Sequence, residues 1–242
     1  MAKRGTVEDR ENPAPLESGA GEAGSPWAEP GAVWKALAPF ATPGRLERLR
    51  KVMDARTLGL VPVLDNLYDP HNLSAILRTA DALGIQRIVL SGQVPDGVNP
   101  RVALGAHRWL SVERFPDPAR AVERLRSEGY LLAATVLDET AISPWAFEPD
   151  RPVALVLGNE HDGISKPWLE AAEARLTIPL AGFSGSLNVS VAAALCMHCL
   201  LRKSVCREHP VEGKERDLLL DRWIRQSVPN ADKILARLAV RR

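Results

Sequence analysis

The sequence alternates continuous apolar runs with segments of helical periodicity, and this alternation limits the possible folds more than any other feature. The apolar runs cover residues 61–66, 87–92, 130–137, 153–159 and 175–180. Helical patterns cover residues 72–83, 118–127, 166–174 and 188–203. Continuous apolar runs are typical of strands in a parallel sheet, because helices bury both faces of such a sheet. We therefore predict an α/β fold with a mostly parallel sheet and helices on both faces.

The N-terminal region does not share this pattern. Residues 1–33 contain nine Gly or Pro residues, and three basic side chains stand against six acidic ones, a net charge of −3. Few large apolar side chains are present to offset the entropy that is lost when a chain becomes ordered. We expect residues 1–42 to form a disordered acidic extension.

Basic helical segments flank the α/β region on both sides. Residues 43–60 contain an amphipathic helix with apolar residues at helical spacing and several Arg and Lys side chains around them. Residues 204–242 form a basic helical tail that is interrupted at Pro229 and carries eight basic against four acidic side chains from Lys214 onward. Such helices often contact phosphates, and a solvated face packed on the main domain is the alternative.

Polar segments follow three of the apolar runs, at the strand ends where open α/β sheets place their sites. In the first, residues 65–84, Asn72 can cap the following helix, and Arg78 lies in an otherwise apolar helical stretch. Because buried arginines need a partner, we expect an anion or a carboxylate near Arg78. A purely structural ion pair is the alternative.

The second and third polar segments contain glycines. In residues 157–165, Gly158 and Gly163 permit a tight turn that presents Asn159 and Glu160, although many strand-to-helix turns look similar. In residues 178–201, a glycine-containing loop leads into a helix rich in small residues, which can pack close to other backbone. Close packing alone is the structural explanation of this third segment.

Several common sites are disfavoured. The dinucleotide fingerprint, the P-loop and the nucleophile elbow of serine hydrolases do not occur in the sequence. Cys196, Cys199, Cys206 and His209 have spacing that invites a zinc site, but two of the cysteines fall inside a predicted helix without the necessary turn. We expect no metal. No apolar run is long enough for a membrane span, and three cysteines do not form a disulfide framework, so we expect a cytoplasmic protein.

Two of the polar segments, PHNLSAILRTADALG and IPLAGFSGSLNVSVAAAL, carry a family resemblance. Over residues 45–203 the chain resembles the SPOUT methyltransferases, particularly the TrmH-type tRNA 2'-O-methyltransferases. The resemblance implies a SPOUT methyltransferase domain at residues 61–203. It also implies a deep trefoil knot at about residues 153–203 that binds S-adenosyl-L-methionine, usually within a homodimer.

The resemblance also assigns roles to individual residues. The catalytic positions are Asn72, Arg78, Glu160, Ser186 and Asn188. The cofactor-binding positions are Leu157, Gly158, Asn159, Gly163, Ile178, Leu180 and Leu187. The RNA-binding candidates are the basic residues of the first flanking segment, Arg45, Arg48, Arg50, Lys51 and Arg56. Because a guanidinium is a poor base, we expect Arg78 to orient the acceptor phosphate and stabilise the forming alkoxide, with deprotonation as a further possible role.

The resemblance implies methyl transfer from S-adenosylmethionine to a ribose 2'-hydroxyl of RNA, with guanosine 18 of the tRNA D-loop as the nearest substrate. The expected partners are tRNA and a second copy of the chain. A ribosomal RNA 2'-O-methyltransferase and a catalytically silent RNA-binding paralogue are the alternatives. The formal charge of +1 excludes only a uniformly basic protein, since local basic patches are enough for RNA binding.

Overall fold

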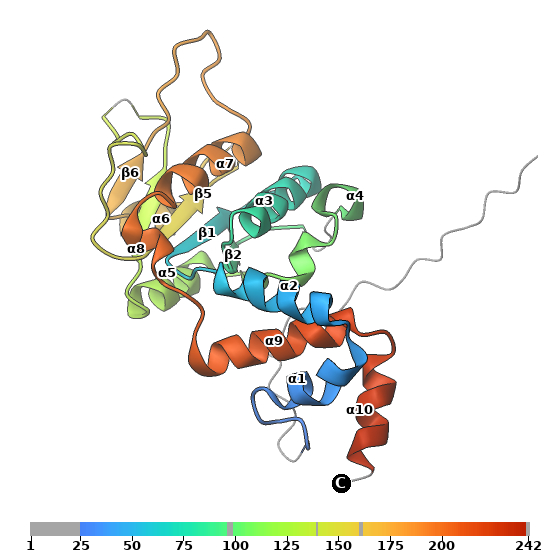
Figure 1. The fold of residues 1–242 in the computed structure, drawn as a ribbon. Coiled ribbons are helices and arrows are strands. Elements are labelled where there is room, and N and C mark those ends of the chain that lie inside the picture. Colours follow the sequence, from blue (N-terminus) through green and yellow to red (C-terminus); the bar gives the residue numbers. More distant parts are fainter. Residues whose placement is uncertain (1–24, 96–98, 139, 160–161, 241–242) are drawn as a thin grey trace, which may run out of the picture.

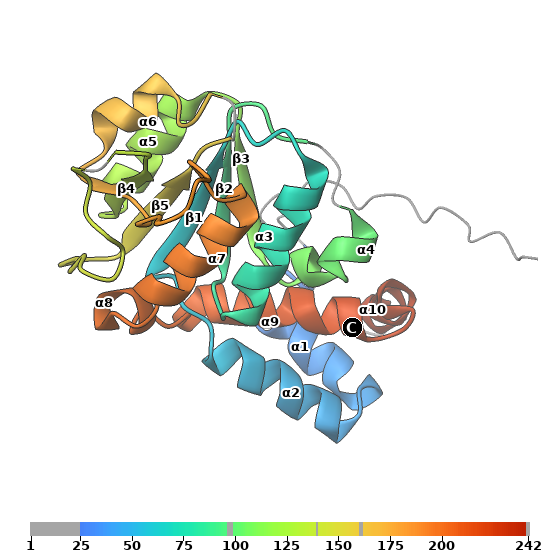
Figure 2. The same ribbon diagram turned by 90° about the horizontal axis from the view of Figure 1, so that it is seen from above.

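A computed structural model describes residues 25–95, 99–138, 140–159 and 162–240. Within them, one parallel sheet has the strand order β3-β2-β1-β5-β4-β6 (Figures 1 and 2). The strands are β1 (Leu60–Asp65), β2 (Arg87–Ser91), β3 (Ser111–Phe115), β4 (Leu131–Thr135), β5 (Val153–Leu157) and β6 (Ala174–Leu176). The predicted α/β class is confirmed.

Helices cover both faces of this sheet (Figure 2). The helices are α1 (Ala32–Leu37), α2 (Pro43–Asp54), α3 (Pro70–Ala82), α4 (Pro100–Ala103), α5 (Pro118–Ser127), α6 (Lys166–Ala171), α7 (Val189–Leu200), α8 (Ser204–Arg207), α9 (Gly213–Ser227) and α10 (Ala231–Ala239), with short 3-10 helices η1 (Ala38–Phe40) and η2 (Ala106–Arg108). Helices α3 and α7 share a core with one face, and α5 and α6 share a core with the other. The continuous apolar strands thus have the two-sided burial that the sequence predicts.

A third core lies outside the sheet and joins the two ends of the chain. Helices α1, α2, α9 and α10 pack together, and Leu37 and Trp223 are completely buried between them. The backbone N–H groups of Gly31 and Trp34 donate to the buried Asp221 carboxylate of α9, at 2.8 and 2.6 Å. The C-terminal helices are therefore packed against the N-terminal ones and do not form a separate tail.

This packing corrects the expected N-terminal extension. The prediction of disorder is wrong for residues 32–40, where α1 and η1 are ordered because Val33 and Leu37 bury their side chains against α9 and its neighbours. Residues 1–24 lie outside the described part of the chain. The charge count of the first 33 residues is correct, but it does not reveal apolar partners that lie almost 200 residues away.

Two further points concern the whole fold. No helix in the described ranges combines the length and apolar character that a membrane crossing requires. The strand order is compatible with the knotted arrangement that the family resemblance implies, but strand order does not define how the chain is threaded, so the knot stays a prediction.

Candidate active site

A cavity of about 410 Å³ lies at the carboxyl ends of β4, β5 and β6. All seven predicted cofactor-binding residues and the predicted catalytic Ser186 line it. One wall of the cavity is not predicted by the sequence; it continues from the end of β4 and consists of Thr135, Val136 and Leu137. Since β4 and β5 are parallel neighbours, their carboxyl ends share this edge, and this adjacency is the signal that could have revealed the missing wall.

A tight turn after β5 lines one side of this cavity. Asn159 and Gly163 exchange two backbone hydrogen bonds of 3.2 Å, and Gly163 has a φ of +70° that favours glycine. The Asn159 side-chain oxygen accepts a hydrogen bond from the Asp162 N–H at 2.7 Å. A Cβ added to Gly158 would lie 2.3 Å from the Gly163 carbonyl atoms, so the backbone approach requires glycine here. The predicted catalytic Glu160 lies outside the described residues.

A buried carboxylate holds this turn to the sheet. Asp65, at the end of β1, is fully buried and accepts hydrogen bonds from the Ser165 N–H at 2.7 Å and the Ser91 hydroxyl at 3.1 Å. The Ser91 oxygen in turn accepts one from the Trp168 indole at 2.9 Å. Buried polar groups are costly unless satisfied. This chain of contacts therefore fixes where α6 begins, directly after the cavity turn.

Two predicted catalytic asparagines meet beside the cavity. The Asn188 amide donates to the Asn72 side-chain oxygen at 3.0 Å, and its own oxygen caps α7 by accepting from the Ser190 N–H at 2.9 Å. Asn72 does not cap α3 as expected, because the helix begins at Pro70 and Asp69 caps it. The pair joins the N-terminal turn of α3 to that of α7, and α7 contributes Val189 to the cavity.

Arg78 has no carboxylate partner among the described residues. Its side chain is exposed on α3, and among the described residues the guanidinium makes no hydrogen bond or ion pair. A protein carboxylate is therefore not the partner of Arg78 in the described part of the chain, and its side chain lies on the exposed side of α3, whose other side is buried. The structural ion pair that could have explained Arg78 is excluded within the described part of the chain.

The five predicted RNA-binding residues differ in their surroundings. Arg48, Arg50 and Lys51 are exposed on α2, and the Arg50 guanidinium lies over the Trp34 ring at 5.1 Å. Arg45 is half-buried, lies over the Trp109 ring at 5.5 Å and donates to Ser227 at 3.0 Å. All four side chains are therefore at least partly accessible to solvent.

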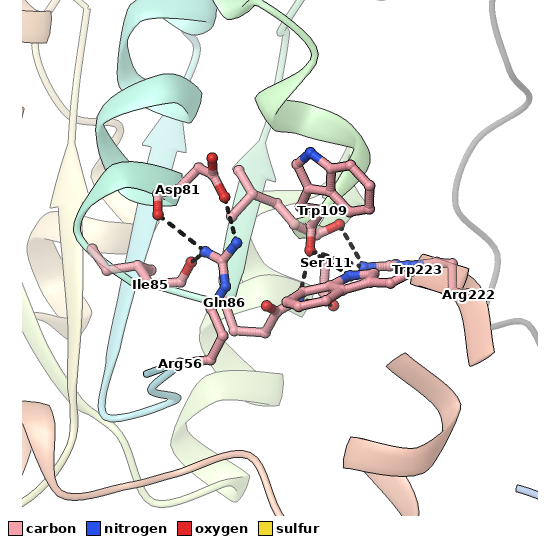
Figure 3. Close-up of polar contacts among 9 residues, drawn as sticks. Arg56, Asp81, Ile85, Gln86, Trp109, Ser111, Arg222 and Trp223 are labelled. Atoms are coloured by element: carbon pink, nitrogen blue, oxygen red, sulfur yellow. Dashed lines mark hydrogen bonds and ion pairs between the residues drawn. The ribbon is translucent and has the colours of Figure 1, made fainter. Parts of the chain in front are cut away.

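The assignment of Arg56 to RNA binding is wrong. This side chain is only 2% exposed, pairs with the Asp81 carboxylate and donates to the Ile85 carbonyl at 3.0 Å (Figure 3). It follows the end of α2, so the basic pattern of the helix does not extend to it. A buried guanidinium that is already paired with a carboxylate cannot reach a phosphate in solvent.

The cysteines that suggested zinc are free thiols. Burial raises the pKa of the Cys196 and Cys206 thiols to about 12, and Cys199 is shifted in the same direction by burial. Metal binding requires the thiolate, which burial disfavours here. Within the described ranges, no group of three His, Cys, Asp or Glu side chains has an arrangement that could hold a metal ion.

Comparison with known proteins agrees with this geometry. Residues 59–198 match the SpoU rRNA Methylase family. The tRNA (guanosine(18)-2'-O)-methyltransferase of Borreliella burgdorferi is 33% identical over 198 residues, which is 80% of this chain and 90% of that protein. The crystal structure of the TrmH/SpoU tRNA modifying enzyme of Aquifex aeolicus has a TM-score of 0.70 at 29% identity and covers 77% of this chain and 98% of that one.

A further solved structure contains a bound cofactor. The SpoU methyltransferase AviRb from Streptomyces viridochromogenes, in complex with AdoMet, has a TM-score of 0.54 at 30% identity, over 63% of each chain. The family match covers more than half of this chain, and the Borreliella protein is similar over most of its length. The chain therefore belongs to the SpoU rRNA methylase family.

Proposed function

We propose that the protein is an S-adenosylmethionine-dependent RNA ribose 2'-O-methyltransferase that modifies guanosine 18 in the D-loop of tRNA. The observation that carries the proposal is the convergence of all seven expected cofactor residues on one cavity next to the Asn72–Asn188 pair. The relative from Borreliella burgdorferi has a name that specifies this reaction. A cytoplasmic location is part of the proposal and is supported by three cysteines that remain unpaired.

The cavity suits S-adenosylmethionine in size and in chemistry. Its volume of about 410 Å³ lies within the range of small-molecule sites, and its walls combine apolar side chains with a few polar ones. Leu157, Ile178 and Leu187 provide apolar surface for an adenine ring, while backbone groups of the glycine turn are free of bulky side chains. When bound, the cofactor would supply a methyl group on a sulfonium: the ribose 2'-oxygen bonds to the methyl carbon as the carbon–sulfur bond breaks, and the neutral thioether leaves.

The remaining steps belong to residues of the chain. Arg78 is exposed and unpaired among the described residues, so its guanidinium is available to bind the phosphate next to the acceptor ribose and to stabilise the oxygen as it loses its proton. The Asn72–Asn188 hydrogen bond holds the start of α3 against the start of α7. Ser186 and the turn after β5 line the cavity in which the cofactor would be held, which supports a role for them beside the transferred methyl group.

The chain divides into two functional parts under this proposal. Residues 61–203 form the SPOUT methyltransferase domain, and α1, α2, α9 and α10 form an RNA-docking part whose shared core is described above. Arg48, Arg50 and Lys51 lie exposed on α2, which supports a phosphate-binding role for this helix. The acidic residues of the first segment carry no assigned role.

Replacing Arg48 and Lys51 together by alanine is expected to weaken RNA binding about tenfold at moderate salt, because about two phosphate contacts are lost. The slope of log affinity against log salt concentration should fall by about 2. Both quantities are measured by fluorescence anisotropy with labelled tRNA. Lys166→Ala, an exposed lysine on α6, is the control. An unchanged salt slope in the double variant would exclude α2 as the docking helix.

A homodimer is supported by apolar side chains on the outer face of α7. Val191 and Leu195, one helical turn apart, are 48% and 38% exposed. Exposed apolar side chains at this spacing are typical of a helix that packs against a partner. The double replacement Val191→Asp and Leu195→Asp should therefore convert a dimer into monomers in sedimentation equilibrium. Val240→Asp, at the exposed end of α10, should leave the dimer intact, and a wild-type protein that is monomeric at high concentration would contradict the proposal.

The activity itself is tested by incubating the protein with labelled S-adenosylmethionine and separate pools of unmodified tRNA and rRNA. We expect label in tRNA, at the 2'-oxygen of guanosine 18 after nuclease mapping. Label in rRNA alone would replace the tRNA assignment by the alternative that the family name suggests. Cofactor binding without label in any RNA would identify a catalytically silent RNA-binding protein.

A further inference from the structure

Arg56 follows the end of α2 and contacts two other parts of the chain, the end of α3 and helix α9 (Figure 3). Its guanidinium pairs with the Asp81 carboxylate, donates to the Asp81 carbonyl at 3.3 Å and to the Ile85 carbonyl at 3.0 Å. On its other side it lies over the Trp223 ring of α9, at 5.3 Å from the centroid. The side chain of Arg56 is 1% exposed and that of Asp81 is 27% exposed, so the pair is shielded from water on one side.

The position of Asp81 on α3 gives this pair a functional consequence. Residues three or four apart on a helix are surface neighbours, and Arg78 lies three residues before Asp81. The other such neighbours of Arg78 on α3 are Ser74, Ala75 and Ala82, so Asp81 is the carboxylate at helical contact spacing. Among the described residues Arg78 nevertheless has no hydrogen-bond or ion-pair partner, and the Asp81 carboxylate is bound by Arg56.

We propose that Arg56 is a positioning residue for Arg78: by holding Asp81, it prevents that carboxylate from competing with RNA for the Arg78 guanidinium. The inference rests on the proposed function of Arg78. The proposal accounts for the burial of the charged Arg56 side chain beside the end of α3. The carbonyls of Asp81 and Ile85 at this helix end also need hydrogen-bond donors, and Arg56 provides them. The RNA phosphate then binds Arg78 without competition from Asp81, whose charge is compensated by Arg56.

The replacement Arg56→Met removes the charge and keeps most of the side-chain volume. Asp81 is then free to pair with Arg78 and to repel a phosphate, and kcat/KM for RNA should fall on the order of tenfold. The cofactor cavity is not touched, so the affinity for S-adenosylmethionine should stay within about twofold of wild type. Adding Asp81→Asn to Arg56→Met removes the competitor, and most of the lost kcat/KM should return.

A second measurement does not depend on turnover. Phenylglyoxal modifies free arginines, and the rate at Arg78 is followed by peptide mass mapping. We expect the rate to fall about twofold in Arg56→Met, as for a same-helix ion pair, and to recover in the double variant. This labelling still tests the inference if the wild-type protein methylates no RNA, an outcome that would remove the proposed function alone.

Matched variants separate this role from a loss of stability. Arg87→Met removes another buried arginine, which pairs with Glu113 and Glu128 away from α3, so it should lower the melting temperature without slowing Arg78 labelling. Arg56→Lys keeps a charge next to Asp81 and should retain most activity. If the double variant with Asp81→Asn stays as slow as Arg56→Met, or if labelling of Arg78 is equal in all variants, Arg56 is structural only and the inference is overturned.

Discussion

Replacing Arg78 by alanine should reduce RNA methylation on the order of a thousandfold, the effect of losing a principal donor to a developing negative charge. The affinity for S-adenosylmethionine should change by less than about twofold, because Arg78 does not line the cavity and its removal leaves the cavity walls intact. Single-turnover methylation of tRNA and calorimetric titration of the cofactor measure the two quantities separately.

Because Arg78 is exposed, its replacement should not destabilise the fold. An exposed side chain without a partner among the described residues contributes little to folding, so a loss of activity cannot be attributed to an unfolded protein. Arg120→Ala, which removes an exposed arginine from α5 on the opposite face of the sheet, is the matched control and should retain full turnover. Turnover at the wild-type rate in Arg78→Ala would remove this residue from the mechanism.

The central part of the fold could be predicted because its strands are buried on both faces. Residues 61–64 and 153–157 are apolar throughout, and both belong to strands that lie at the centre of the sheet. Strand β3 was missed because it lies at the edge, where its side chains are mostly only partly buried and include Glu113 and Arg114. An edge strand needs fewer apolar side chains, so a search for continuous apolar runs does not detect it.

The helical part at the chain ends could not be predicted for a different reason. Val33 and Leu37 become buried only because α9 brings Leu220 and Trp223 against them. Such contacts between distant segments have no local signature in composition or periodicity. The same limit explains Arg56, which belongs to the basic pattern in sequence but meets Asp81 and Trp223 in space.

The cavity shows a similar division between what local sequence predicts and what topology adds. The glycine turn at residues 158–163 and the loop before α7 stand out in sequence, since glycine and polar residues interrupt apolar runs. Thr135 does not stand out in the sequence, since it ends a run of strand residues. In the structure its hydroxyl donates to the Val156 carbonyl at 2.9 Å inside the sheet. Only the adjacency of β4 and β5 brings it to the cavity.

Replacing Gly158 by valine should abolish measurable cofactor binding, with an affinity loss of about a hundredfold or more. The first added carbon would lie 2.3 Å from the carbonyl carbon and oxygen of Gly163 and 2.6 Å from the Ile164 nitrogen. These are backbone atoms, so relief requires the turn to move away from β5. Overpacking of this kind costs about 1–3 kcal/mol, and the turn is also a wall of the cavity.

Two measurements decide whether Gly158 acts through the cavity or through the fold. Asp65 anchors the far end of the turn at Ser165, so the sheet should remain folded and circular dichroism should stay close to that of wild type. Calorimetry with S-adenosylmethionine should then show the loss of binding in a folded protein. Gly44→Ala, where an added Cβ meets no atom within 4 Å, should bind normally. A valine side chain at position 158 cannot fit without displacing the Gly163 backbone. If Gly158→Val still binds the cofactor with normal affinity, the backbone of this turn does not form the cofactor site.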